Sequence, residues 1–409
     1  MNAPLIAKDA FCSERIGVAR LAKMSFDGVN LRPLWHELME KTTDDAKGAG
    51  IGLDLSIIAQ LLGDKATGLA IQDEVLGYQR LYRSPCSVAK PRLRLLALAA
   101  ATDIGGNTPV EFLLEGSEIE LITLYVVPGT PLPPVPDHDV AMVVVCDSHE
   151  TRATLAELER LVAQWPRPVI NQPRRLAELD RDRLYPLIRD VPGLVIPATA
   201  RLKRVELAAL AQGSLALKDV LKDGAYPLVV RPVDSHAGFG LDKVDDHLAL
   251  IAYLAQRPEE NFFLSPFVDY SDADGLFRKY RVVAVDGEAH ACHMAIADQW
   301  KIWYLNTEMT TNPALRAEEA AFMAKFREDF GRRHGAALKE MFARIGLEYL
   351  TVDCAETKDG KLLVFEADSA AIVHNMDPPQ IFPYKPPQMH KIFAAFQEMI
   401  ARHAQSRGR

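Results

Sequence analysis

The segment from Tyr349 to Asp368 constrains the fold more than any other part of this 409-residue chain. It holds two apolar runs separated by Asp359-Gly360, and an Asp-Gly pair in that setting indicates a two-residue hairpin turn. With those two residues in the turn, Asp353 lies directly opposite Glu366. Side chains two positions apart on a strand share a face, so Asp368 lies on the same face as Glu366. The sequence therefore predicts a hairpin with three carboxylates on one face.

Three carboxylates on one patch of a sheet require compensation, because like charges that face each other destabilise the sheet. A hard divalent cation provides it, since Mg²⁺ prefers oxygen ligands and commonly binds a few carboxylates together with substrate phosphates. Asp353, Glu366 and Asp368 are therefore the candidate metal ligands. A solvated sheet face that carries ordinary acids is the alternative interpretation.

A second candidate site follows the apolar run that ends at Arg231. The loop after it contains Gly238 and Gly240, whose lack of side chains lets backbone N–H groups approach phosphate oxygens. The glycine spacing is neither that of a P-loop nor that of a dinucleotide fingerprint. An ordinary turn is the alternative interpretation of this loop.

A third candidate site is the strand-like segment that contains Lys279 and Arg281 and leads to Asp286-Gly287. The two cations are two positions apart, so they share one strand face and could clamp a phosphate or a developing oxyanion. Solvated charges on an edge strand are the alternative interpretation.

Composition narrows the class of protein. The chain is 48% hydrophobic and 25% charged, which is typical of a globular protein, and its length predicts two or three domains. The net charge of -8 argues against binding to nucleic acid, which usually needs clustered positive charge. Five scattered cysteines without close pairs favour a reducing cytoplasm. No run approaches the roughly 20 apolar residues of a membrane span, so we expect a cytoplasmic protein with no membrane partner.

The pattern along the chain changes twice. Residues 1–90 show helical apolar spacing and are predicted to form a helical N-terminal region. Residues 91–170 alternate apolar runs with helix-like segments, which predicts an α/β domain. The apolar runs are Leu93–Ala100, Ile119–Val127 and Val140–Cys146. Residues 171–409 carry the three candidate sites and form the third predicted unit.

The order of these sites resembles the ATP-grasp superfamily from about Arg167 to Lys391. More narrowly, Pro168–Pro173, Arg231–Gly240 and Phe365–Asp368 look like a branch related to glutathione synthetase and ribosomal-protein glutamate ligases. That branch is often fused to tetratricopeptide repeats, but no 34-residue repeat occurs here. The resemblance implies an α+β ATP-grasp fold in residues 171–409. Its nucleotide-binding lid would span about 198–265, and its metal-binding subdomain would span about 266–400.

The resemblance also implies roles for single residues. Arg281 matches the arginine that steadies an acyl phosphate, with Lys279 as a helper, and Asp353, Glu366 and Asp368 match the magnesium ligands. The third ligand of the family is usually Asn, so Asp368 adds a negative charge. The nucleotide contacts would be Arg183, Arg231, Ser235, His236, Ala237, Gly238, Gly240, Leu264, Phe267, Val268 and Asp269.

One more candidate lies on the loop after the metal-binding strand. His374 is a candidate for substrate contact or proton transfer there, and a packing or surface histidine is the alternative.

The activity that the resemblance implies is that of an Mg-ATP-dependent ligase. Such an enzyme activates a small-molecule or peptide carboxylate as an acyl phosphate and joins it to an amine or thiol, and it releases ADP and phosphate. A C–N bond is the expected product. Mn²⁺ in place of Mg²⁺ and a homodimer are left open. The alternatives are a regulatory nucleotide-binding module without turnover and a small-molecule kinase.

Overall fold

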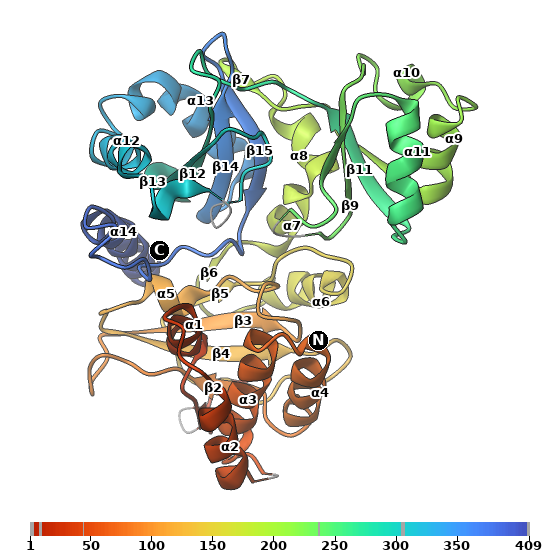
Figure 1. Ribbon diagram of the computed structural model, residues 1–409. Coiled ribbons are helices and arrows are strands. Elements are labelled where there is room, and N and C mark those ends of the chain that lie inside the picture. Colours follow the sequence, from red (N-terminus) through yellow and green to blue (C-terminus); the bar gives the residue numbers. More distant parts are fainter. Residues whose placement is uncertain (1–3, 8–9, 44, 236–237, 304–306, 407–409) are drawn as a thin grey trace.

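Three β-sheets organise the fold of this chain (Figure 1). The computed structural model describes residues 4–7, 10–43, 45–235, 238–303 and 307–406. The six-stranded first sheet occupies one half of the molecule, and the four-stranded second sheet and five-stranded third sheet occupy the other half. This mixed arrangement of helices and sheets confirms the predicted α/β fold class.

The first sheet has the strand order β1-β2-β4-β3-β5-β6. Its strands are β1 (Ser13–Glu14), β2 (Leu81–Arg83), β3 (Leu93–Ala100), β4 (Ile119–Val126), β5 (Val140–Val143) and β6 (Val169–Ile170). Within this sheet, β3 pairs in parallel with β4 and β5, and β5 pairs in parallel with β6. β3, β4 and β5 lie within the three apolar runs of the sequence, whose side chains are mostly buried.

The N-terminal region is less separate than its sequence predicts. It contains α1 to α4 but also gives β1 and β2 to the first sheet, so the boundary at residue 90 cuts through one shared sheet. A buried ion pair between Arg15 and Glu111 adds a further link to the α/β domain. The helices of this half are α1 (Val18–Phe26), α2 (Arg32–Lys41), α3 (Ala49–Leu61), α4 (Lys65–Leu76), α5 (Val110–Leu113) and α6 (Arg152–Val162).

The second sheet is antiparallel, in the order β10-β9-β11-β8, and packs against helices on one face. Along β11, Phe262 and Leu264 face those helices in a small separate core, whereas Phe263 and Ser265 face the other way. The elements are β8 (Ala200–Lys203), α9 (Arg204–Ala211), α10 (Leu217–Val220), β9 (Leu228–Pro232), β10 (Asp242–Val244), α11 (His247–Gln256) and β11 (Asn261–Pro266).

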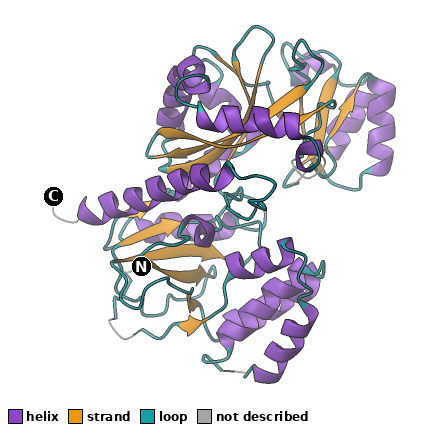
Figure 2. Ribbon diagram, turned by 60° about the vertical axis from the view of Figure 1, so that its left-hand side comes forward, coloured by secondary structure: helices purple, strands orange, loops and turns teal. Residues whose placement is uncertain are grey.

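The third sheet has the order β13-β12-β14-β15-β7. Helix α14 packs between this sheet and the first sheet, where it contacts β12 and β13 as well as β3 and β5 (Figure 2). One continuous core therefore joins the two sheets. The elements are β7 (Leu194–Val195), β12 (Phe277–Val285), β13 (Glu288–Ala297), the short helix η3 (Glu308–Thr310), α12 (Pro313–Ala324), α13 (Phe330–Ile345), β14 (Tyr349–Glu356), β15 (Leu362–Asp368) and α14 (Lys385–Gln405).

The β14–β15 hairpin has the predicted pairing of Asp353 with Glu366, but its loop length and its register near the turn differ from the prediction. Near the turn, Cys354 pairs with Val364, so the loop is one residue longer than the predicted two-residue turn. Gly360 has a φ of 77°, which a three-residue hairpin loop requires of its last position. A bulge then shifts the register, and Asp353 pairs with Glu366. The two deviations compensate, so the two carboxylates lie opposite each other as predicted.

No helix in the described part of the chain is long and apolar enough to cross a bilayer. All five cysteines are free thiols.

Asn171 connects the first sheet to the third. The chain leaves β6 there and continues through α7 (Pro173–Leu176), the short helix η1 (Ala177–Leu179) and α8 (Arg181–Ile188). The buried Asn171 amide donates to the carbonyl of Tyr349 at 2.9 Å and accepts from the N–H groups of Glu348 and Tyr349 at 3.1 and 3.0 Å. Its φ of 57° lies in the left-handed region, which Asn tolerates better than most residues.

We expect Asn171→Ala to lower the free energy of unfolding by about 2 to 4 kcal/mol, because it removes three hydrogen bonds and places a Cβ residue at positive φ. The matched control is Asn171→Gly, which loses the same bonds without the strain and should be less destabilised by about 1 kcal/mol. Denaturant midpoints measure both. Equal stability of wild type and Asn171→Ala would contradict this role.

Candidate functional site

A pocket lies between the second and third sheets. The residues that line this pocket include both apolar and cationic side chains. Its apolar lining includes Ile196, Val229, Phe267, Val268, Leu363 and Phe365. Its charged lining consists of Arg181, Arg231, Lys279, Lys301 and Glu366. Such a wall suits a ligand with a flat apolar group and an anionic group.

The two arginines of the pocket share one carboxylate, that of Glu366. Burial, together with the neighbouring guanidinium of Arg181, lowers the pKa of Arg231 to about 9. Burial also lowers the pKa of Arg181, although Asp180 opposes this shift. Arg231 donates from Nε to the hydroxyl of Ser235 at 3.1 Å, and this neutral partner supplies no opposite charge. A bound polyanion would offset the repulsion between the two guanidinium groups.

Asp353 is the buried centre of a charge cluster on the third sheet, with 2% of its side chain exposed. Arg281 donates to its two oxygens at 2.7 and 3.0 Å, and the Lys279 ammonium lies 2.7 Å from Oδ2. Burial alone would raise the pKa of Asp353, but Arg281 and Lys279 hold that pKa far below its usual range. The carboxylate is therefore ionised and already has two cationic partners.

The other two carboxylates have partners of their own. Arg181 donates to Oε2 of Glu366, and Nη1 of Arg231 lies 3.9 Å from the same oxygen. Oδ1 of Asp368 accepts from the N–H of Ala370 at 2.7 Å, just beyond the end of β15.

The predicted cluster of three metal-binding carboxylates is therefore not assembled in this structure. Among the described residues, no group of three or more His, Cys, Asp or Glu side chains could hold a metal ion. The physical reason is that Arg281, Lys279 and Arg181 supply the positive charge that the sequence interpretation assigned to a metal. Mg²⁺ needs only one or two carboxylates when phosphates complete its shell, and the oxygen donors of Glu366 and Asp368 fit that smaller requirement.

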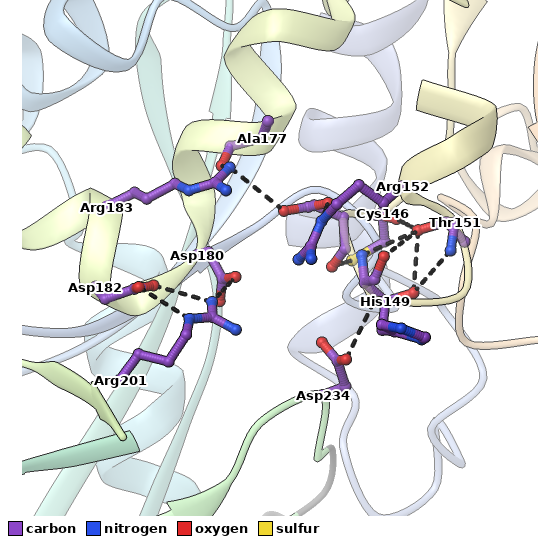
Figure 3. Close-up of polar contacts among 12 residues, drawn as sticks. Cys146, His149, Thr151, Arg152, Ala177, Asp180, Asp182, Arg183, Arg201 and Asp234 are labelled. Atoms are coloured by element: carbon purple, nitrogen blue, oxygen red, sulfur yellow. Dashed lines mark hydrogen bonds and ion pairs between the residues drawn. The ribbon is translucent and has the colours of Figure 1, made fainter. Parts of the chain in front are cut away.

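Of the two arginines near the start of α8, the predicted contact Arg183 donates to the carbonyl of Ala177 at 2.8 Å (Figure 3). Arg183 does not line the pocket, whereas Arg181 does. Residues two apart on a helix lie on nearly opposite sides, so only one of the pair can face the pocket. The spacing alone could not tell which one, because the rotation of α8 depends on its packing.

The glycine loop lies beside the pocket. Ser235 donates to the carbonyl of Pro232 at 2.7 Å and so fixes the loop next to Arg231. Gly240 has a φ of 63°, and a Cβ there would lie 2.5 Å from a side-chain carbon of Pro232, so only glycine fits. Gly238 also has a positive φ, of 73°. The predicted contacts His236 and Ala237 lie outside the described residues.

Lys301 is a pocket residue that sequence reasoning missed. It lies just after β13, lines the pocket, and donates to the carbonyl of Leu241 at 2.7 Å, at the end of the glycine loop. Trp300 lines the pocket beside it. No motif or residue spacing in the sequence predicts a binding role for this segment. Its one distinctive feature is a lysine between two tryptophans, Trp300 and Trp303.

The predicted hinge contacts divide into two groups. Phe267 and Val268 line the pocket, whereas Leu264 lies in the core of the second sheet because strand alternation turns it away. Asp269 does not line the pocket. It pairs with Lys358 at 2.5 Å, and this hydrogen bond holds the pKa of Asp269 at about 2.

His374 also lies outside the pocket. Its ring packs near the rings of Phe26 and Phe112, and its Nδ1 accepts from the N–H of Met376 at 3.0 Å. Burial lowers the pKa of His374 to about 4, although Asp377 opposes the shift. These contacts give it the packing role that the sequence left as an alternative.

Comparison with known proteins returns remote likenesses. No protein-family model and no curated protein matches the chain. Among solved structures, it is similar to a D-alanine–D-alanine ligase from Bacillus anthracis complexed with ATP, at 15% identity and a TM-score of 0.47 over 78% of this chain and 100% of that chain. It is also similar to the VanG D-Ala:D-Ser ligase from Enterococcus faecalis, at 13% identity and a TM-score of 0.46 over 76% and 100%.

A third solved structure is a RimK-domain ATP-grasp protein from Sphaerobacter thermophilus, at 19% identity and a TM-score of 0.41 over 76% of this chain and 99% of that chain. At these TM-scores the likenesses carry no functional conclusion. A functional proposal therefore has to be argued from the residues of the pocket.

The two paired carboxylates should differ in their effect on stability. We expect Asp353→Ala to lower the free energy of unfolding by about 3 to 5 kcal/mol, because Arg281 and Lys279 lose their buried anion. Glu366→Ala should cost less than about 1 kcal/mol, because its pair with Arg181 is partly exposed. Denaturant melts of both variants test this, and equal losses would contradict the assignment of Asp353 as the structural centre.

Proposed function

We propose that this chain is an ATP-grasp ligase that depends on Mg-ATP, releases ADP and forms a C–N bond. The observation that carries the proposal is the pocket between the second and third sheets, which joins an apolar wall to four cationic side chains beside a carboxylate. A nucleotide has the same division into a flat base and a charged polyphosphate. The cationic side chains are Arg181, Arg231, Lys279 and Lys301.

In this proposal the base packs against the apolar wall near Phe267 and Val268, which both sheets help to form. The phosphates lie against Arg181 and Arg231, whose neighbouring guanidinium groups share the single carboxylate of Glu366 and would gain a second anionic partner. Ser235 and Leu241, on either side of the glycine loop, contact Arg231 and Lys301 of the pocket, which would place both residues near the phosphates.

Glu366 and Asp368 would hold Mg²⁺ together with the phosphates, and the ion would supply charge neutralisation there. Arg181 would then exchange Glu366 for a phosphate. Asp353 takes a different role from the one that the resemblance implies, because it stays the counter-ion of Arg281 and Lys279. Lys279 lines the pocket and also contacts Asp353, so it connects the charge cluster to the bound anion.

The proposed reaction has two steps. An oxygen of the substrate carboxylate bonds to the γ-phosphorus, the bond from that phosphorus to its bridging oxygen breaks, and ADP leaves with the electron pair. An amine nitrogen then bonds to the carbonyl carbon, and the C–O bond to phosphate breaks. Inorganic phosphate leaves with that electron pair and takes up the proton lost by the nitrogen. The cations of the pocket reduce the repulsion between the carboxylate and ATP.

A regulatory module that binds nucleotide without turnover is the second candidate. The observation that favours it is that Asp353 and Glu366 are already neutralised by cations of the chain. The two candidates differ in turnover, because only the ligase releases ADP and phosphate when both substrates are present. A kinase would release ADP but leave the phosphoryl group on its product.

We expect Arg181→Ala to weaken Mg-ATP binding by about tenfold or more, because the loss of a charged hydrogen bond costs about 1.5 to 3 kcal/mol. The matched control, Arg183→Ala, should bind like wild type because Arg183 does not line the pocket. Calorimetry measures both affinities. ADP release in the presence of pooled carboxylic acids and amines then tests turnover, and the product mass separates ligase from kinase.

Two results would contradict the proposal. Equal weakening in both arginine variants would place the nucleotide elsewhere. Wild-type affinity for ATP without ADP release under any acid and amine pool would favour the regulatory module.

A further inference from the structure

Lys279 belongs both to the charge cluster around Asp353 and to the lining of the pocket. Its ammonium nitrogen lies 2.7 Å from Oδ2 of Asp353. Its side chain is 22% exposed and lines the pocket together with Glu366. One ammonium group therefore neutralises a buried carboxylate and also offers positive charge to a ligand in the pocket.

Asp353 has little room for a metal ion. A carboxylate offers about four acceptor positions, and Arg281 and Lys279 occupy three of those of Asp353. Only 2% of the side chain is exposed, so the position that is left is closed to solvent. Mg²⁺ binds oxygen at about 2.0 to 2.1 Å and usually keeps several waters, which a closed position does not admit. Asp353 would therefore have to lose a cation of the chain before it could bind a metal.

Glu366 and Asp368 are more accessible than Asp353. The side chain of Glu366 is 30% exposed. The polar contacts of Asp368 with described side chains and backbone are to neutral groups, namely the N–H of Ala370 at 2.7 Å and the thiol of Cys146 at 3.9 Å. The two acids are two positions apart on β15 and share a face. Two carboxylates and the phosphates are enough for one Mg²⁺.

The position that a second ion would need is already taken. Paired metal ions in enzymes stand about 3.5 to 4 Å apart, so a second ion would lie beside the first one. The residue directly opposite Glu366 in the sheet is Asp353. The ammonium of Lys279 lies against that carboxylate. A metal ion at the same oxygen would be repelled by this ammonium group.

We infer that the site binds a single divalent cation, which Glu366 and Asp368 hold together with the phosphates. The ammonium of Lys279 takes the place of a second cation against Asp353. This inference rests on the proposed function. The positive charge at this position is part of the chain and is in place before the phosphates arrive. Asp353 is the residue that positions it.

Titration with Mn²⁺ measures the number of bound ions without turnover. The full chain is mixed with an equal concentration of a non-hydrolysable ATP analogue, and electron paramagnetic resonance reports the free Mn²⁺ after each addition. We expect binding to saturate at one Mn²⁺ per chain. Saturation at two Mn²⁺ per chain would overturn the inference.

Lysine variants of the pocket test the role of the ammonium group. Lys279→Ala should raise the stoichiometry from one to two Mn²⁺ per chain, because it uncovers Asp353 and removes the competing charge. Lys279→Arg keeps the charge and should stay at one. The matched control is Lys301→Ala, because Lys301 also lines the pocket but donates to the carbonyl of Leu241 and not to an acid. This control should also stay at one.

A double variant locates the additional ion. Adding Asp353→Asn to Lys279→Ala should return the stoichiometry to one, because the additional ion loses its ligand. A stoichiometry that stays at one in Lys279→Ala, or that rises equally in Lys301→Ala, would overturn the role of Lys279. Thermal melts show whether each variant is folded, and the titration of the wild type decides the inference even where a variant is not.

The two proposals fail in different ways. Failure of the analogue to bind at all would overturn the proposed function and this inference with it. Binding of the analogue together with two ions in the wild type would overturn this inference alone.

Discussion

The ionised carboxylate of Asp353, buried between Arg281 and Lys279, is the interaction on which the rest of the site depends. It ties β12 to β14 across the middle of the third sheet, where Arg281 and Asp353 are direct strand partners. Such a cluster is stable only when every charge has a partner, because removing any one of them leaves a buried charge unmatched. Its geometry therefore places Lys279 in the lining of the pocket that we propose binds the nucleotide.

The other charged residues of the site are arranged around Asp353. Glu366 pairs with Asp353 in the strand register but takes its own cation, Arg181, from α8. Arg181 and Arg231 both lie against this one carboxylate, so a polyanion in the pocket would offset the repulsion between their guanidinium groups.

The sequence predicted the strands and the facing carboxylates because both depend on local patterns. Unbroken apolar runs marked β3, β4 and β5, and the Asp-Gly turn placed Asp353 opposite Glu366 even though the loop was one residue longer. What failed depended on the packing of distant segments. The rotation of α8 decided that Arg181 and not Arg183 faces the pocket, and Lys301 entered it from a segment without a recognisable spacing. The cationic partners of Asp353 and Glu366 could not be predicted from the sequence for the same reason.

Hydrogen exchange with and without Mg-ATP tests the central claim most directly, because the claim is that one nucleotide contacts two separate sheets. The account predicts slower exchange on binding in residues 228–235 and 263–268 of the second sheet and in 362–366 of the third, with the N-terminal helices unchanged. Protection confined to one sheet, or found only in the half of the molecule that holds the first sheet, would contradict it.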